Sequence, residues 1–389
     1  MRAHLDIFDR AHAYVEHCRR HHSRQPKRAS LCLAWWGLLH SLSREKRFSS
    51  EGKEFRVAMV IDGGLGDNLL HIRYIKDFCS QYGPFHLDVY SSLDPLVART
   101  LFGGITNVAS VRSGRVEDVY DLILYSLLVP MTVSYCKERL DKLASPALKT
   151  YVESLERFKA KNSHWFAFQQ YGMAGILNYA RITGTKREAL PYMIGDLQLK
   201  TKPFLELELT RPDFPWGAKT FVTVSRGSGA TQESTKLWPV HRYDECLRLL
   251  RRRFPGVIFV QTGDKHEKKL EVDYDLRGKT SFEELAVLMR DAALHISSEG
   301  GTVHLRHLLG GGPSAVFFGP TDPSFYGYAE NCNLRAEECT PCEWVQLDWQ
   351  KRCCRGFGVC RALEMLETEE VVQKIIKHPK ALEALCKIS

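Results

Sequence analysis

Short apolar runs alternate along the chain with segments in which apolar residues recur every three or four positions. The run at 55–61 (FRVAMVI) is continuous, which is typical of a parallel strand buried on both faces. The same pattern predicts strands at 55–61, 86–90, 108–111, 120–125, 220–224, 257–261, 293–296 and 314–318. Helices are predicted after residue 67, through most of 137–180, at 243–254, 281–290 and 369–385, and from about 302 to the triple glycine at 310–312.

This alternation predicts an α/β fold with more than one domain. A chain of 389 residues is longer than one typical domain. The stretch 195–219 contains Pro203, Pro212, Pro215 and Gly217 without a sustained period, so we expect the domain boundary there. We predict a helical extension at 1–50, a first domain at 51–200, a second with a parallel, doubly wound sheet at 216–330, a cysteine segment at 331–362 and a C-terminal helix at 363–389.

The strand at 293–296 runs into the turn Ser-Ser-Glu-Gly-Gly, and a helix follows. The start of that helix presents unpaired N–H groups and the positive end of a dipole, which favour an anion. Glu299 lies at the end of the strand, Gly300 and Gly301 allow a ligand to approach the backbone, and His304 is one turn into the helix. The alternative is an ordinary βαβ turn with a structural histidine.

A second glycine turn, 62–67 (DGGLGD), connects the strand at 55–61 to the next helix. It does not match the dinucleotide fingerprint, because the glycine spacing differs and no acidic residue on a second strand completes a ribose site. Asp67 is therefore either a helix cap or a functional carboxylate, and the spacing favours neither.

The loop 225–239 follows the first strand of the second domain and is rich in small and hydroxyl residues. Such a loop suits phosphate oxygens, and Lys236 adds a compact positive charge. The sequence therefore indicates a second anion-binding element in the same half of the chain.

Five of the twelve cysteines are clustered in the cysteine segment, namely Cys339, Cys342, Cys353, Cys354 and Cys360. A C-x2-C pair with further cysteines downstream has the spacing of a four-thiolate metal site, with zinc as the default and iron as an alternative. Four ligands suffice, so either Cys353 or Cys354 is spare. A site with four sulfur ligands has no open position, so the metal would be structural. Free thiols or a reversible disulfide are the alternatives.

Residues 1–50 carry ten of the Lys and Arg side chains against four Asp and Glu, whereas the rest of the chain is near neutral. Helices there would either dock on an anionic membrane or protein surface, or pack as an extra layer on the first domain. The chain has no apolar run long enough to span a membrane and no signal-peptide pattern. We therefore expect a cytoplasmic protein, possible contact of residues 1–50 with the inner membrane, and no nucleic-acid partner.

Three motifs resemble, in order, those of the heptosyltransferase family of GT-B glycosyltransferases (glycosyltransferase family 9). They are the turn ending in Asp67, Lys236 followed by Trp-Pro, and the 299–304 turn followed by FFGPTDP. The resemblance covers roughly 55–385 and implies two Rossmann-like domains facing a cleft, with ADP-heptose as the donor. It implies Asp67 and Lys236 as catalytic residues and no catalytic divalent metal. The substrate-binding residues it implies are Gly66, Thr231, Ser234, Glu299, Gly300, Gly301, Thr302 and His304.

The cysteine segment and the N-terminal extension resemble one branch of that family, which modifies autotransporter adhesins and carries an iron-bearing cysteine finger. The implied acceptor is Ser or Thr of a bacterial surface protein, with a lipopolysaccharide core sugar as the alternative and a homo-oligomer as a possible assembly. Two positions depart from the family, which usually has Asp at Glu299 and Thr or Ser at Gly300. A scaffold that binds a nucleotide without catalysis is a third hypothesis, and a metal-dependent nucleic-acid binder is a weaker one.

Overall fold

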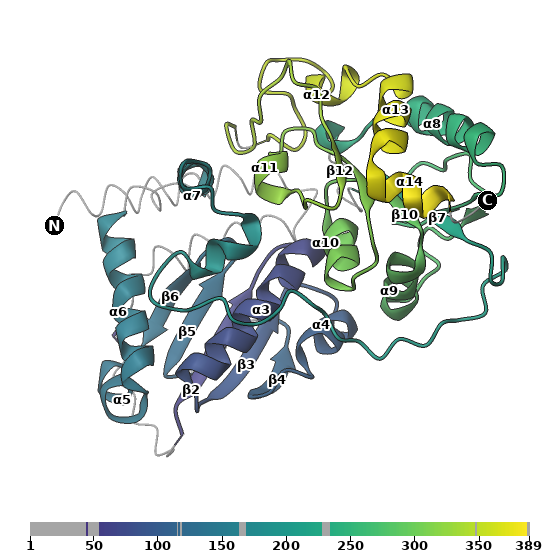
Figure 1. Cartoon of the computed structure of the whole chain (residues 1–389). Coiled ribbons are helices and arrows are strands. Elements are labelled where there is room, and N and C mark those ends of the chain that lie inside the picture. Colours follow the sequence, from purple (N-terminus) through teal and green to yellow (C-terminus); the bar gives the residue numbers. More distant parts are fainter. Residues whose placement is uncertain are drawn as a thin grey trace.

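The computed structural model describes residues 44–45, 54–114, 116, 119–162, 169–227, 234–346 and 348–386. These residues form two sheets of six strands, each covered by helices (Figure 1). The predictions for 1–50 lie outside the described residues, except for the two-residue strand β1 (Arg44–Glu45). Thr231 also lies outside them.

The first sheet has the order β1-β6-β5-β2-β3-β4. Its other strands are β2 (Arg56–Ile61), β3 (His86–Ser91), β4 (Val108–Arg112), β5 (Leu122–Ser126) and β6 (Pro130–Tyr135). All pairs are parallel except β5 with β6. The predicted strands are present, but β6 was not predicted. Only 127–129 connect β5 to β6, and so short a connection permits a hairpin but no parallel crossover.

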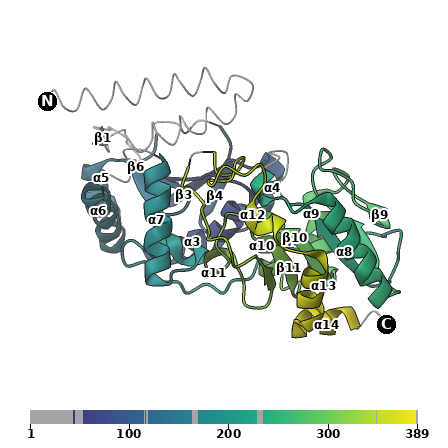
Figure 2. The same ribbon diagram turned by 90° about the horizontal axis from the view of Figure 1, so that it is seen from above.

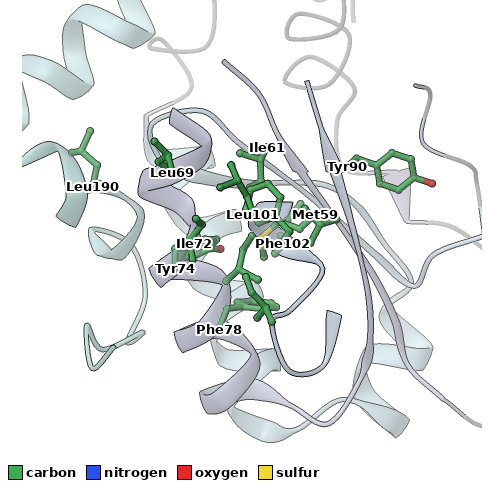
Figure 3. Packing of buried hydrophobic residues seen from close by; sticks show 14 of the residues in the cluster. Met59, Ile61, Leu69, Ile72, Tyr74, Phe78, Tyr90, Leu101, Phe102 and Leu190 are labelled. Carbon is green, nitrogen blue, oxygen red and sulfur yellow. The ribbon is translucent and has the colours of Figure 1, made fainter. Parts of the chain in front are cut away.

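Helix α3 (Leu65–Tyr82) packs on this sheet and supplies much of the first core. Ile72, Tyr74 and Phe78 of α3 and Met59 and Ile61 of β2 belong to the cluster drawn in Figure 3, and each is almost fully buried. The other helices of this domain are α4 (Pro95–Phe102), α5 (Lys137–Leu143), α6 (Pro146–Lys161), α7 (Gln169–Thr183) and the 3-10 helix η2 (Arg187–Tyr192). The core therefore fixes the position of α3, whose first turn faces the second domain.

The second sheet has the order β12-β11-β10-β7-β8-β9, and every neighbouring pair is parallel. Its strands are β7 (Phe221–Ser225), β8 (Ile258–Gln261), β9 (Tyr274–Asp275), β10 (Leu294–Ser298), β11 (Ser314–Phe317) and β12 (Cys332–Leu334). The parallel, doubly wound sheet is thus confirmed. The short edge strands β9 and β12 were not predicted, and β12 lies in the segment that the sequence assigned to the cysteines.

The helices of the second domain include α8 (Val240–Arg253), α9 (Phe282–Asp291), α10 (Gly301–Leu308), α11 (Pro323–Tyr326) and α12 (Arg361–Glu364). The predicted C-terminal helix is two helices, α13 (Thr368–Lys377) and α14 (Pro379–Cys386), because Pro379 cannot continue the first. Their buried apolar residues belong to the second core. Helix α13 packs against α8 and β12, and α14 lies beside β10; Figure 2 shows α13 next to α8.

Residues 195–219, where the sequence predicts the domain boundary, contain no helix or strand. Among the described helices, none has both the length and the apolar character that crossing a lipid bilayer requires.

Candidate functional site

A cavity of about 620 Å³ lies between the two sheets, and both domains line it. From the first domain come Gly66 and Asp67, which follow β2. From the second come Ser225 at the end of β7 and residues of the turns that follow β7, β8 and β10. Ligands of open α/β sheets bind outside the carboxyl ends of the strands. The cavity is lined by eight of the residues that the sequence singled out, namely Gly66, Asp67, Lys236, Glu299, Gly300, Gly301, Thr302 and His304.

The first turns of α3 and α10 lie in close contact at the cavity, with a glycine of each turn at the point of approach. A Cβ atom on Gly301 would lie 2.9 Å from Leu65 Cβ and 3.0 Å from the Gly66 nitrogen. A Cβ atom on Gly66 would lie 2.7 Å from Cδ2 of His304. Contacts this short leave no room for a side chain at either position. Two helix N-termini therefore converge on one cavity, and the positive ends of both dipoles favour an anion there.

Asp67 is both a cap of its helix and a wall of the cavity. Its Oδ2 accepts a hydrogen bond from the Gly64 N–H at 3.0 Å. The preceding Gly63 has a φ of +102°, which L side chains rarely adopt, and its position lets the carboxylate reach back. The Asp67 side chain is 32% exposed. The structural hypothesis and the functional one are therefore compatible.

Arg187 of η2 holds the other oxygen of this carboxylate, and sequence reasoning missed it. Its Nη2 donates to Asp67 Oδ1 and to the Leu127 carbonyl, both at 2.7 Å. The side chain is buried and lines the cavity, and its Nη1 has no hydrogen-bond partner among the described residues. Two other arginines of the first domain, Arg73 and Arg112, pair with Glu188 and Asp88 and do not line the cavity.

On the opposite wall, Lys236 and Glu299 form an ion pair. Nζ of Lys236 lies 3.1 Å from Oε2 of Glu299, and both side chains are largely buried. The ammonium group also lies 5.4 Å from the centre of the Trp349 ring. Lys236 ends the 3-10 turn η4 (Ser234–Lys236), and the side chain of Ser234 is outside the described part. The cavity thus has a buried cation beside the N-terminus of α10, where a phosphate group would fit.

His304 and Thr302 of α10 also line the cavity, but both are already hydrogen-bonded within the protein. His304 Nδ1 lies 2.7 Å from the Tyr328 hydroxyl, and burial lowers the pKa of the imidazole to about 4. It is therefore neutral at pH 7, with one ring nitrogen donating and the other accepting. The Thr302 hydroxyl lies 3.0 Å from Nε2 of His295, a buried residue of β10.

The cysteine segment contributes a part of the wall that was not predicted. Glu343, Trp344 and Trp349 line the cavity, as does Tyr326 of α11. The Tyr326 hydroxyl donates to Oε1 of Glu343 at 2.8 Å. Burial raises the pKa of the Glu343 carboxyl to about 7, although Lys236 nearby opposes the shift.

The five clustered cysteines are free thiols that lie near one another. The Cys342 thiol interacts with those of Cys354, Cys360 and Cys339, and Cys360 interacts with Cys339 and Cys353. Burial raises the pKa of the Cys360 thiol to about 11. Within the described residues, no three side chains are arranged as ligands around one point. The donor set nevertheless fits a thiophilic ion such as zinc or iron.

Residues 213–350 match the family model "Glycosyltransferase family 9 (heptosyltransferase)". A search of curated proteins found no match. Among solved structures, the chain is similar to the bacterial iron-containing dodecameric glycosyltransferase TibC from enterotoxigenic E. coli H10407, with 16% identity over 85% of this chain and 77% of TibC and a TM-score of 0.53. A structure of TibC in complex with ADP-D-beta-D-heptose gives 14% identity, 86% and 77% coverage and a TM-score of 0.52.

A third similar structure is the E. coli ADP-heptose lps heptosyltransferase II, with 14% identity, coverage of 86% of this chain and 99% of that one, and a TM-score of 0.47. The two matches to TibC, together with the sheet topology, confirm the GT-B fold. The family match confirms the resemblance to heptosyltransferases within the second domain.

Proposed function

We propose that this chain, whose second domain matches glycosyltransferase family 9, transfers heptose from ADP-heptose to an acceptor hydroxyl with inversion at the anomeric carbon. One observation carries the proposal. Asp67 and Lys236 line the same cavity between the two domains of the GT-B fold. Asp67 is a carboxylate on the side of the first domain, and Lys236 is a cation beside a helix N-terminus of the second. An inverting transfer needs a base for the acceptor on one side and a stabiliser of the leaving diphosphate on the other.

The second domain would hold the donor. The N–H groups of Gly300 and Gly301 at the start of α10, together with Lys236, would stabilise the negative charge of ADP as it leaves. Lys236 pairs with Glu299 at 3.1 Å, so both groups can contact one ligand, the cation at its phosphate and the carboxylate at its hydroxyls. Thr231 and Ser234 would add hydroxyl contacts to the diphosphate. This set of charges needs no catalytic divalent metal.

The first domain would activate the acceptor. Asp67 would take the proton of the acceptor hydroxyl. The hydroxyl oxygen would form a bond to the anomeric carbon while the bond from that carbon to the diphosphate oxygen breaks. Each oxygen of Asp67 accepts one hydrogen bond within the protein, from Gly64 and from Arg187. A carboxylate has about four lone-pair sites, so capacity remains for the incoming proton. Arg187 would be a positioning residue that fixes the orientation of this base.

Ser or Thr of a bacterial surface protein is the acceptor that we favour. The support is the likeness to TibC, which is described as iron-containing, together with the clustered cysteines of this chain. TibC is also described as dodecameric, and we expect a homo-oligomer here, which gel filtration with light scattering would measure. The family match names no acceptor, so a lipopolysaccharide core sugar is the alternative.

We further infer that four of the five cysteines hold one structural metal ion, with either Cys353 or Cys354 as the spare thiol. Such an ion would fix the conformation of the cysteine segment against the cavity. Metal analysis of the purified protein would give about one equivalent of zinc or iron per chain. Cys339→Ser should lose it, whereas Cys246→Ser, at a buried cysteine of α8, should keep it.

The deciding experiment is intact-mass analysis after incubation with ADP-heptose and two acceptors, a surface-protein fragment of the autotransporter type and a truncated lipopolysaccharide core. A heptose increment on the protein fragment, absent with Asp67→Asn, would support both the chemistry and the favoured acceptor. An increment on the core alone would keep the chemistry and replace the acceptor. If both acceptors and the donor stay intact while ADP binds, the chain is a nucleotide-binding scaffold or uses another nucleotide sugar.

A further inference from the structure

We propose that the cysteine segment forms the pocket for the donor's sugar ring, with Glu343 as the hydroxyl-binding residue and Trp344 and Trp349 as its apolar walls. The proposal rests on the proposed function, because it assigns a subsite within the same cavity. It gives the cysteine segment a direct role in recognising the substrate.

Glu343 has the burial and the free capacity that a ligand-binding acid needs. Glu343 is only 7% exposed and lines the cavity. Oε1 accepts from Tyr326, whereas Oε2 has no hydrogen-bond partner among the described residues. Buried polar atoms are nearly always hydrogen-bonded, and those that are not call for an explanation. A sugar hydroxyl that donates to Oε2 would supply the missing partner.

The neighbouring Trp344 has a strained backbone. Its φ is +61°, a region that bulky residues rarely occupy, and such strain tends to cluster at ligand sites. Its ring centre lies 5.6 Å from that of Trp349, and both side chains line the cavity. Ligand pockets combine mostly apolar walls with a few well-placed polar groups. Two indole rings beside a carboxylate match a sugar, which has apolar C–H faces and donating hydroxyls.

The segment is attached to the elements that would hold the diphosphate. The Thr235 hydroxyl, next to Lys236, donates to the Trp349 carbonyl at 2.9 Å. The N–H groups of Cys342 and Glu343 both donate to the Pro320 carbonyl, at 2.9 and 3.1 Å. Pro320 follows β11, the strand that pairs with β10, which leads to Glu299. A sugar bound at Glu343 would therefore lie next to the phosphates at Lys236.

Calorimetric titration with ADP and with ADP-heptose, without acceptor, separates the sugar contact from the nucleotide contacts. The variants are Glu343→Gln, which keeps the shape of the side chain, and Trp344→Gly, which suits the positive φ but removes the ring. Glu338→Gln is the matched control, because Glu338 is an exposed acid of the same segment. ADP affinity also reports that each variant has folded.

We expect Glu343→Gln to weaken ADP-heptose binding about tenfold or more, as for loss of a hydrogen bond to a charged group, and to change ADP binding less than twofold. Trp344→Gly should act in the same direction. Equal losses for ADP and ADP-heptose would overturn the proposal, because the segment would then contact the nucleoside or phosphates. So would variants that retain the wild-type preference for ADP-heptose. A wild-type protein that binds ADP-heptose no better than ADP would instead refute the proposed donor, and the subsite with it.

Discussion

The two glycine turns that meet at the cavity have the same local structure and different chemistry. Each connects a buried central strand to a helix, but the first places its acid inside the helix and the second places it before the helix. Asp67 is bound by the Gly64 N–H of its own turn and by Arg187, and is 32% exposed. Glu299 ends its strand, pairs with Lys236 and is 8% exposed. The position of the acid relative to the helix start therefore separates an accessible carboxylate from a buried one paired with a cation.

The largest expected effect comes from removing the charge of the accessible acid. Asp67→Asn should lower heptose transfer by about 10²- to 10⁴-fold, because it removes the general base, while ADP binding stays within twofold. Initial rates of ADP release with saturating acceptor would measure it. Asp94→Asn changes an acid that also caps a helix but lies outside the cavity, and it should leave the rate unchanged. Equal rates for wild type and Asp67→Asn would remove Asp67 from the mechanism.

The next effect comes from the cation of the second turn. Lys236→Met should lower kcat by about 10²- to 10³-fold, as for other groups that stabilise a charged leaving group, and should weaken ADP binding as well. Part of the loss arises because Glu299 stays buried without its partner, so adding Glu299→Gln should restore some ADP affinity. Lys142→Met is the control, since Lys142 forms an exposed ion pair with Glu138. A double variant that binds ADP no better than the single one would show that Lys236 and Glu299 act independently.

Substitution of Arg187 tests whether Asp67 depends on its ion-pair partner as Glu299 depends on Lys236. Arg187→Gln should lower kcat by roughly tenfold to a hundredfold, because a displaced base transfers the proton poorly, and should leave the KM for ADP-heptose nearly unchanged. Arg187→Lys should recover part of kcat. A second buried Arg–Asp pair, Arg139 with Asp121, is remote from the cavity, so Arg139→Lys controls for loss of stability. A rise in KM without a fall in kcat would assign Arg187 to donor binding.

The smallest effect concerns the contact between the turns. Gly301→Ala should destabilise the protein by about 1–3 kcal/mol, since the new methyl group would overlap Leu65 and the Gly66 backbone. Thermal unfolding would measure the change, and ADP affinity should fall with it. Gly104→Ala is the control, because a Cβ atom there would meet nothing within 4 Å. Equal melting temperatures for the two variants would show that the turns can move apart.

The sequence predicted the parts of this site that belong to one local pattern. Both turns, the position of His304 and Lys236 follow from strands, glycines and helix starts that are close in the chain. Arg187 could not be predicted, because its partner Asp67 lies in a distant segment and nothing around Arg187 marks it as buried. Glu343 was hidden for another reason. The cysteines around it indicate a metal site, and only the folded chain shows that the segment also lines the cavity.

The fold shows the same division. The ends of the strands that lead into the glycine turns were predicted within a few residues, because the apolar runs of these strands are continuous. The reversed direction of β6 was not, since it depends on the length of a connection and not on any periodicity. The single C-terminal helix was predicted across Pro379, where the apolar spacing continues although the hydrogen bonding does not.

The contact of Gly301 with Leu65 and Gly66 also bears on how this protein can diverge. A side chain gained at one turn would be tolerated only if the other turn moved or lost atoms. The residue types that are tolerated at positions 65 and 66 therefore depend on those at positions 301 and 304, although the two turns are far apart in the chain. Among homologues, residues 65 and 66 should covary with 301 and 304. Gly104, whose added Cβ would meet nothing within 4 Å and which does not line the cavity, should vary independently of them.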